Sequence, residues 1–154
     1  MWILPELSER LMKRQVTIQK NNPDPCHFPL YGAYVPAGFP SPADDFIENT
    51  LDLNTYLIRH PAATFFVRVQ GDSMVGAGIH QGDILIVDRA LEPRDMTVIV
   101  AAVDGDLVVK RMRRKKDGRI FLESENPLYP VMEVPPEADL HVWGVVTYVI
   151  HSLG

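Results

Sequence analysis

Two residues with the chemistry of a nucleophile and its base lie 37 positions apart, Ser73 in GDSM at 71–74 and Lys110 in LVVKRMR at 107–113. A serine hydroxyl is a weak nucleophile until a base accepts its proton. Lysine can be that base only when its pKa falls, and desolvation lowers the pKa because it disfavours the charged amine. The pair therefore predicts acyl transfer only if the fold buries Lys110 and brings it to Ser73.

The alternation of LVVKRMR predicts a strand and indicates how Lys110 could become buried. Lys110 shares one strand face with Val108 and Met112, while Arg111 lies on the other face. If the first face is the core face, the ammonium group enters apolar surroundings. On the pattern alone, the simpler interpretation is favoured: a lysine that extends from a strand edge and a serine that shapes a Gly-rich turn.

Histidine is the other side chain that could act as the base. The sequence has five: His27, His60, His80, His141 and His151. None lies in a pattern that singles it out, and His60, next to Pro61 at the end of a predicted helix, is typical of a capping or surface residue. Lone histidines are more often structural or solvated than catalytic, so histidine is the weaker candidate.

Composition and charge narrow the class of protein. The chain of 154 residues suits one domain, and its 46% hydrophobic and 23% charged residues are typical of a soluble globular protein. The net charge of -5 argues against bulk affinity for nucleic-acid phosphates. The single cysteine, Cys26, excludes an intrachain disulfide framework and favours a reducing cytosol. Asp83, Asp88, Asp104 and Asp106 lie in turn contexts without the spacing of a metal motif, so we expect no metal site and no cofactor.

The first part of the chain differs in texture from the rest. Apolar residues at helical spacing predict a short amphipathic helix at about 5–18, and the charges among them are not typical of an export signal. Six prolines between residues 21 and 45 then predict an extended arm that is neither helix nor central strand. No apolar run reaches the roughly 20 residues that span a bilayer, so we expect no membrane anchor.

Short apolar runs follow. DFIENTLDLNTYLIRHP at 45–61 predicts a short helix that ends at Pro61. Six runs then alternate with turn signals such as EPRD, DGD and KKDGR. The runs lie at 64–70, 83–88, 97–103, 107–113, 120–124 and 140–150. This order predicts a mostly β protein, a folded antiparallel sheet or barrel with short helices.

The strongest local charge feature is the basic cluster RMRRKK at 111–116. It precedes Asp117-Gly118, which predicts a hairpin end where positive side chains are solvated and guard a sheet edge. Contact with DNA or a protein partner is the less favoured alternative.

Seven ordered segments resemble the UmuD-like branch of the LexA-like family of self-cleaving S24 peptidases. They are GFPSPADD at 38–45, LDLNTYLIRHPAATFFV at 51–67, GDSM at 71–74, GDILIVD at 82–88, IVAAVDGDLVVKRM at 99–112, ENPLYP at 125–130 and VWGVV at 142–146. The resemblance covers nearly everything from Phe28 to the C-terminus and implies the LexA/UmuD-like antiparallel fold with an extended N-terminal arm. It also implies that Ser73 is the nucleophile and Lys110 the general base, with the backbone amides of Asp72 and Ser73 as the oxyanion hole.

The family cuts its own chain at a small residue followed by glycine, upstream of the catalytic fold. The matching dipeptide is Ala37-Gly38, 35 positions before Ser73. Its small side chains allow close approach, and Pro36 restricts the local conformations. The resemblance therefore divides the chain into a removed segment at 1–37 and a catalytic and dimerisation domain at 38–154.

The resemblance further implies partners. These are a second copy in a homodimer, a RecA filament on single-stranded DNA as activator, and a UmuC-like Y-family DNA polymerase that the trimmed, cytoplasmic form joins for translesion synthesis. Too few residues precede Gly38 for a helix-turn-helix reader, so we expect no sequence-specific DNA binding. Two alternatives stay open: a noncatalytic dimeric interaction module on the same fold, and a signal-peptidase-like enzyme that acts on other proteins, which the missing membrane anchor disfavours.

Overall fold

The computed structural model describes residues 27–31, 37–38 and 47–154. They fall into two units, one within residues 8–59 and one that contains residues 60–154. The helix predicted at about 5–18, Cys26 and most of the proline-rich arm lie outside the described residues. Among the described residues, every helix is too short to cross a bilayer.

The first unit contains a two-stranded antiparallel sheet followed by one turn of helix. Strand β1 (Phe28–Tyr31) pairs with β2 (Ile47–Leu51), and α2 (Leu53–Leu57) follows. The Asp52 side chain accepts a hydrogen bond from the Asn54 amide at 3.0 Å, which caps the helix. The helix predicted over 45–61 is thus wrong in its first half, because pairing with the distant segment 28–31 decides that conformation.

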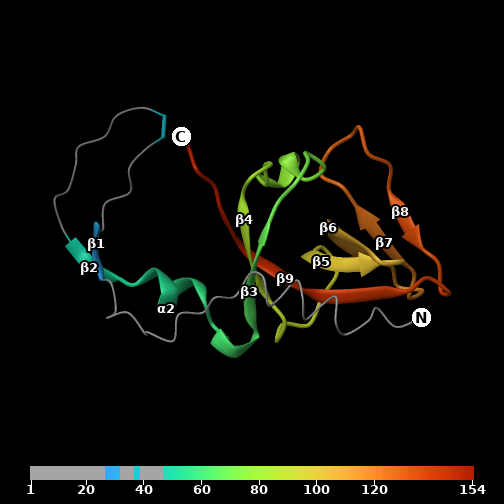
Figure 1. Ribbon diagram of the computed structural model, residues 1–154, viewed down its shortest axis with the longest axis horizontal. Coiled ribbons are helices and arrows are strands. Elements are labelled where there is room, and N and C mark those ends of the chain that lie inside the picture. The colour runs from blue at the N-terminus through green and yellow to red at the C-terminus, as the bar shows by residue number, and fades with distance from the viewer. Residues whose placement is uncertain (1–26, 32–36, 39–46) are drawn as a thin grey trace. The chain divides into compact units, whose positions relative to one another are not determined.

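The second unit is built on a seven-stranded sheet in which all paired neighbours are antiparallel, in the order β3-β4-β9-β5-β6-β7-β8 (Figure 1). The strands are β3 (Thr64–Arg68), β4 (Ile84–Asp88), β5 (Val98–Val103), β6 (Asp106–Arg114), β7 (Ile120–Glu123), β8 (Met132–Val134) and β9 (Leu140–Ile150). Two 3-10 turns, η1 (Pro61–Ala63) and η2 (Val75–Ala77), complete it. The predicted mostly β antiparallel fold is confirmed, and all six expected strands are present in this unit. Its three-residue strand β8 was not predicted, and neither were β1 and β2 of the first unit.

The long strand β9 joins the two parts of this sheet. It lies between β4 and β5, and its pairing shifts register once against each of them. Such bulges bend a strand, and Figure 1 shows β3 and β4 running in a different direction from β5 to β7. At Gly144 the backbones come so close that an added Cβ would lie 2.9 Å from the Asp88 carbonyl oxygen, so this crossing requires glycine.

Alternate residues of β5 contribute to two hydrophobic clusters, so that both faces of this strand are covered. The buried members of the first are Val69, Met74, Ile79, Leu85, Val87 and Val100, and those of the second are Ile99, Ala101, Met112, Leu122 and Val145. Met74 and Ile79 are each only 2% exposed. The loop that begins beside Ser73 is therefore anchored in the core at both of these points.

The β5–β6 connection is a two-residue turn at Asp104-Gly105. Both residues have positive φ, 47° and 91°, as a type I′ hairpin turn requires. The predicted DGD turn is thus confirmed. This turn sets the register that places Lys110 opposite the fully buried Ile99.

Candidate active site

Ser73 and Lys110 line one pocket in the second unit. The pocket has a volume of about 340 Å³, and Val67, Val69, Val100 and Trp143 are among the side chains that line it. Ser73 comes from the loop between β3 and β4, and Lys110 from the middle of β6. The structure thus brings together the two residues that the sequence predicts as nucleophile and base.

Lys110 is half-buried on the strand face that it shares with Met112, which is 1% exposed. Burial lowers the pKa of Lys110 below the ordinary lysine value, because desolvation disfavours the ammonium form. Its Nζ donates a hydrogen bond to Ser124 Oγ at 2.6 Å and lies 5.4 Å from the centre of the Tyr129 ring. The surroundings of Lys110 therefore lower its pKa, as a lysine that acts as a general base requires.

Ser124 is the partner of Lys110 that the sequence analysis missed. It follows β7, and continuing the Arg111–Glu123 pair by one residue sets Ser124 opposite Lys110. The predicted KKDGR turn could have indicated this pairing. In a hairpin centred on Asp117, the residues seven positions before and after the centre, Lys110 and Ser124, lie opposite each other. The hydroxyl holds the lysine amine from the β7 side of the site.

The chain that follows Ser124 also fastens the serine loop. The Gly76 amide donates a hydrogen bond to the Glu125 carbonyl oxygen at 2.7 Å. A Cβ added to Gly76 would lie 2.6 Å from that same oxygen, so no larger residue fits without displacing one segment. This contact fixes the loop that carries Ser73 against the chain that positions Lys110.

Asp72, next to Ser73, makes two further links to the same segment. Its carbonyl oxygen accepts a hydrogen bond from Asn126 Nδ2 at 3.0 Å, and its carboxylate accepts one from the Tyr129 hydroxyl. The carboxylate raises the pKa of Tyr129, because the bond stabilises the protonated phenol. Tyr129 thus contacts both sides of the site, Asp72 through its hydroxyl and Lys110 through its ring.

The backbone amides of Asp72 and Ser73 follow a glycine turn. Gly71 has a φ of 88°, which glycine adopts without strain. Within the described part of the chain, neither of the two amides donates to a protein acceptor. Amide donors that are free in this way can bind the oxygen on which negative charge develops during acyl transfer.

The predicted cleavage dipeptide belongs to the other unit. Ala37 and Gly38 are both exposed, and a Cβ added to Gly38 would meet no described atom within 4 Å. The bond between them is therefore open to approach from at least one side.

The histidines that were weighed as bases lie elsewhere. His60 Nδ1 is 2.6 Å from Asp88 Oδ2, and His80 and His151 both contact Asp83. None of the described histidines is among the residues that line the pocket. Lys110 thus shares the pocket with Ser73, and the described histidines do not.

Two side chains of the basic cluster form ion pairs, although the sequence predicts that the cluster is solvated. Arg111 forms an ion pair with Glu125, and Arg113 lies 3.2 Å from Asp95 and 3.4 Å from Glu123. The expectation that the cluster guards a sheet edge is wrong, because β6 lies between β5 and β7. Arg111 and Arg113 therefore contact acidic residues of neighbouring segments, whereas Arg114, Lys115 and Lys116 are exposed.

Comparisons with known proteins agree with this arrangement. The Peptidase S24-like family model matches residues 29–147. SamA of Salmonella typhimurium is 50% identical over 124 residues, 80% of this chain and 85% of that protein. ImpA of Escherichia coli is 44% identical over 123 residues (80% and 83%), and MucA of Escherichia coli is 40% identical over 126 residues (81% and 83%). The chain therefore belongs to the Peptidase S24-like family of self-cleaving serine peptidases, and its similarity to SamA, ImpA and MucA groups it with the UmuD-like proteins of SOS mutagenesis.

Proposed function

We propose that this protein cleaves its own chain between Ala37 and Gly38, with Ser73 as nucleophile and Lys110 as general base. The observation that carries the proposal is the shared pocket, which Ser73 and a half-buried Lys110 of lowered pKa line together with apolar side chains. Membership of a serine peptidase family supports the assignment. The exposed dipeptide supplies a substrate within the same chain.

The reaction is acyl transfer in two steps. The neutral Lys110 amine accepts the Ser73 proton while Oγ attacks the Ala37 carbonyl carbon, and the amides of Asp72 and Ser73 bind the oxyanion. The tetrahedral intermediate collapses as Lys110 returns the proton to the Gly38 amine, which leaves. Lys110 then accepts a proton from water while the water oxygen attacks the ester carbonyl carbon. It passes this proton to Ser73 Oγ as the ester bond breaks, which releases the segment that ends at Ala37 and restores the free serine.

The surroundings of Lys110 suit a reaction that occurs once per molecule. Burial lowers the pKa of Lys110 and so raises the unprotonated fraction of the amine, the form that can accept the Ser73 proton. A tethered substrate compensates for a slow base, because its effective concentration is high. Ser124 acts in this scheme as a positioning residue, because its hydroxyl holds the Nζ of the base.

A serine-reactive probe tests the dyad independently of the N-terminal segment. The intact chain is treated with a fluorophosphonate at alkaline pH, and the added mass is measured. We expect one adduct, on Ser73, that Ser73→Ala and Lys110→Ala both lose, while the exposed-serine control Ser152→Ala keeps it. Equal labelling of Lys110→Ala and the unmodified chain would remove lysine from the mechanism.

We infer that the trimmed form acts in the cytoplasm as a homodimer and as a subunit of an error-prone, UmuC-like Y-family polymerase, and that RecA filaments on single-stranded DNA activate the cleavage. The similarity to SamA, ImpA and MucA supports this inference. Cleavage leaves 154 - 37 = 117 residues and removes four basic and three acidic residues, so the net charge changes only from -5 to -6. The trimming thus acts through shape more than through charge.

Binding measurements test that inference. The intact Ser73→Ala chain and a chain that begins at Gly38 are each titrated with a Y-family polymerase. We expect tighter binding by the trimmed chain, because removal of residues 1–37 uncovers or frees a contact surface. Equal affinity of the two forms would contradict this role for cleavage.

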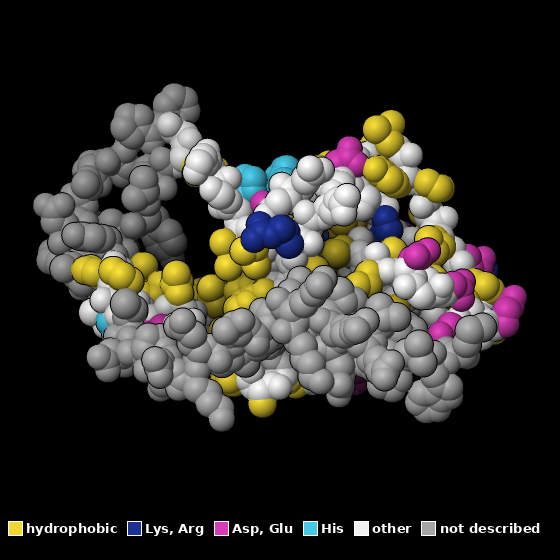
Figure 2. Space-filling model, viewed as in Figure 1, with side chains coloured by type: hydrophobic (Ala, Val, Ile, Leu, Met, Phe, Trp, Pro, Cys, Tyr) yellow, Lys and Arg dark blue, Asp and Glu magenta, His cyan; other side chains and the backbone are white. Residues whose placement is uncertain are grey.

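A noncatalytic interaction module is the second candidate, and one surface favours it. Leu128, Val131 and Met132 are 84%, 58% and 41% exposed along the segment before and within β8. Hydrophobic side chains gather in this region in Figure 2. If the Ser73→Ala chain binds its partners as tightly as the trimmed chain does, interaction and not cleavage is the function of this domain.

A further inference from the structure

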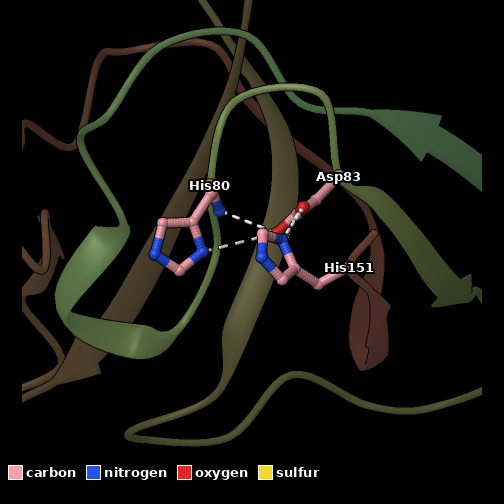
Figure 3. Close-up of side chains that lie close together, drawn as sticks. All are labelled: His80, Asp83 and His151. Atoms are coloured by element: carbon pink, nitrogen blue, oxygen red, sulfur yellow. Dashed lines mark hydrogen bonds and ion pairs between the residues drawn. The ribbon is translucent and has the colours of Figure 1, made fainter. Parts of the chain in front are cut away.

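His80, Asp83 and His151 meet at the surface of the second unit (Figure 3), and none of the three is among the residues that line the active-site pocket. His80 and Asp83 belong to the turn before β4, and His151 directly follows β9. The pairing of Ile84 with Ile150 brings the end of β9 beside this turn. No metal site was expected, because the spacing of Asp83 from the other carboxylates matches no metal motif. His80 and His151 are 71 positions apart in the sequence, and the register of β4 and β9 brings them together.

The three side chains are arranged around one carboxylate. Asp83 Oδ1 lies 2.6 Å from His151 Nδ1, and Asp83 Oδ2 lies 3.7 Å from His80 Nδ1. The ring centres of the two histidines are 4.8 Å apart, and Figure 3 shows both rings next to the carboxylate. The potential ligand atoms all lie within 4.8 Å of one another.

Burial differs sharply between the carboxylate and the imidazoles. The Asp83 side chain is 3% exposed, whereas those of His80 and His151 are 49% and 42% exposed. The carboxylate is also fixed, because its Oδ2 accepts the His80 amide at 2.7 Å. A rigid, buried anion with two movable imidazoles beside it can close around a cation without moving the backbone.

The potential ligand atoms lie near the separations of a zinc site, and small side-chain movements are needed because the widest separation reaches up to 4.8 Å. Ligand atoms about 2.1 Å from one ion are at most about 4.2 Å apart, and about 3.4 Å apart at the tetrahedral angle. The 3.7 Å between His80 Nδ1 and Asp83 Oδ2 lies within this range. The 2.6 Å contact of His151 with Asp83 has to open by about 0.8 Å when an ion replaces the shared proton, and the exposed ring has room to move.

We propose that His80, Asp83 and His151 bind a divalent transition-metal ion, with zinc as the best-matched probe and a water molecule in the fourth position. Two imidazoles and one carboxylate favour zinc and its neighbours over magnesium and calcium, which prefer oxygen ligands. The ion links the turn before β4 to the end of β9, and it takes no part in the serine-lysine chemistry. The metal therefore stabilises the fold around the serine loop.

The test is zinc titration of the tag-free, full-length Ser73→Ala chain after treatment with a chelator and its removal, followed by calorimetry and by thermal unfolding. We expect one zinc ion per chain and a melting temperature that rises by roughly 5–10 °C at 100 times Kd. His80→Ala and His151→Ala should each weaken zinc binding at least tenfold. His141→Ala, a histidine exposed on β9, is the matched control and should bind zinc unchanged.

Two results would overturn the proposal. One is zinc binding of equal strength in the His80→Ala, His151→Ala and His141→Ala chains. The other is a melting temperature that zinc raises no more than the same concentration of magnesium does. Each variant is also melted in chelator, and this melting temperature is compared with the one in zinc. A variant that is destabilised but still binds zinc gains melting temperature when zinc is added, whereas a variant that has lost a ligand does not.

Discussion

Replacing Ser124 by alanine tests how Lys110 is held. The 2.6 Å bond from Nζ to Ser124 Oγ serves the charged amine, because the ammonium donates and the hydroxyl accepts. Its loss removes a partner that favours the protonated form, so the pKa of Lys110, already lowered by burial, falls further. The pH at which self-cleavage is half-maximal should therefore move to lower pH in Ser124→Ala.

The maximal rate of self-cleavage at alkaline pH should fall in Ser124→Ala, although the lower half-maximal pH by itself favours cleavage. A hydrogen bond from a charged donor contributes about 1.5–3 kcal/mol. The low end of this range applies here, because Lys110 is only half-buried and its neutral amine can still bond to Ser124. A loss of about 1.4 kcal/mol in positioning corresponds to a tenfold slower reaction. Ser124→Ala should thus cleave about tenfold more slowly on the alkaline plateau.

The assay is the first-order rate of self-cleavage from neutral to strongly alkaline pH, followed by intact mass. Ser124→Thr is the rescue variant, because it keeps the hydroxyl, and Ser152→Ala is the surface control. An unchanged plateau together with an unchanged half-maximal pH would refute the reasoning that Ser124 positions the base. A shift to higher pH would refute the direction assigned to the pKa.

Three other substitutions have defined outcomes. Lys110→Met should raise the melting temperature, because burial disfavours the charged amine, and the gain should shrink as pH rises and be smallest well above about pH 10.4, where lysine is neutral in both the native and the unfolded state; a gain independent of pH would contradict it. Gly76→Ala should slow cleavage at least tenfold, because its Cβ meets the Glu125 carbonyl oxygen at 2.6 Å, and an unchanged rate would show that this contact does not position the serine loop. Asp88→Ala should cost about 2–3 kcal/mol in urea denaturation, because a buried carboxylate that accepts from His60 and a backbone amide is lost; a cost below about 0.5 kcal/mol would argue against that pair.

Much of the sheet could be predicted from the sequence because its strands are short apolar runs between strong turn signals. The Asp104-Gly105 turn is an example, since both residues favour the positive φ that a tight hairpin needs. The segment 47–51 was misassigned as helix, because its pairing with 28–31 is a contact distant in sequence that local periodicity does not contain.

Part of the candidate site could likewise be predicted from the sequence, and part could not. The strand alternation put Lys110 on the face of Met112 but left open which face is buried. In the structure Met112 is buried, and Lys110 and Ser73 line the same pocket. Ser124 was missed because a lysine partner across a hairpin depends on register. The cluster of His80 and His151 was missed for the same reason, since the β4–β9 register joins segments far apart in the chain.

The most direct test of the central claim is the mass of the fragments that the purified full-length chain releases. The chain is incubated from neutral to strongly alkaline pH beside Ser73→Ala, Lys110→Ala and the control Lys116→Ala. The account predicts a single cut between Ala37 and Gly38 that accelerates with pH in the unmodified chain and the control, and that both active-site variants lose. No cut at any pH, even with RecA filaments added, or a cut that survives Lys110→Ala, would contradict it.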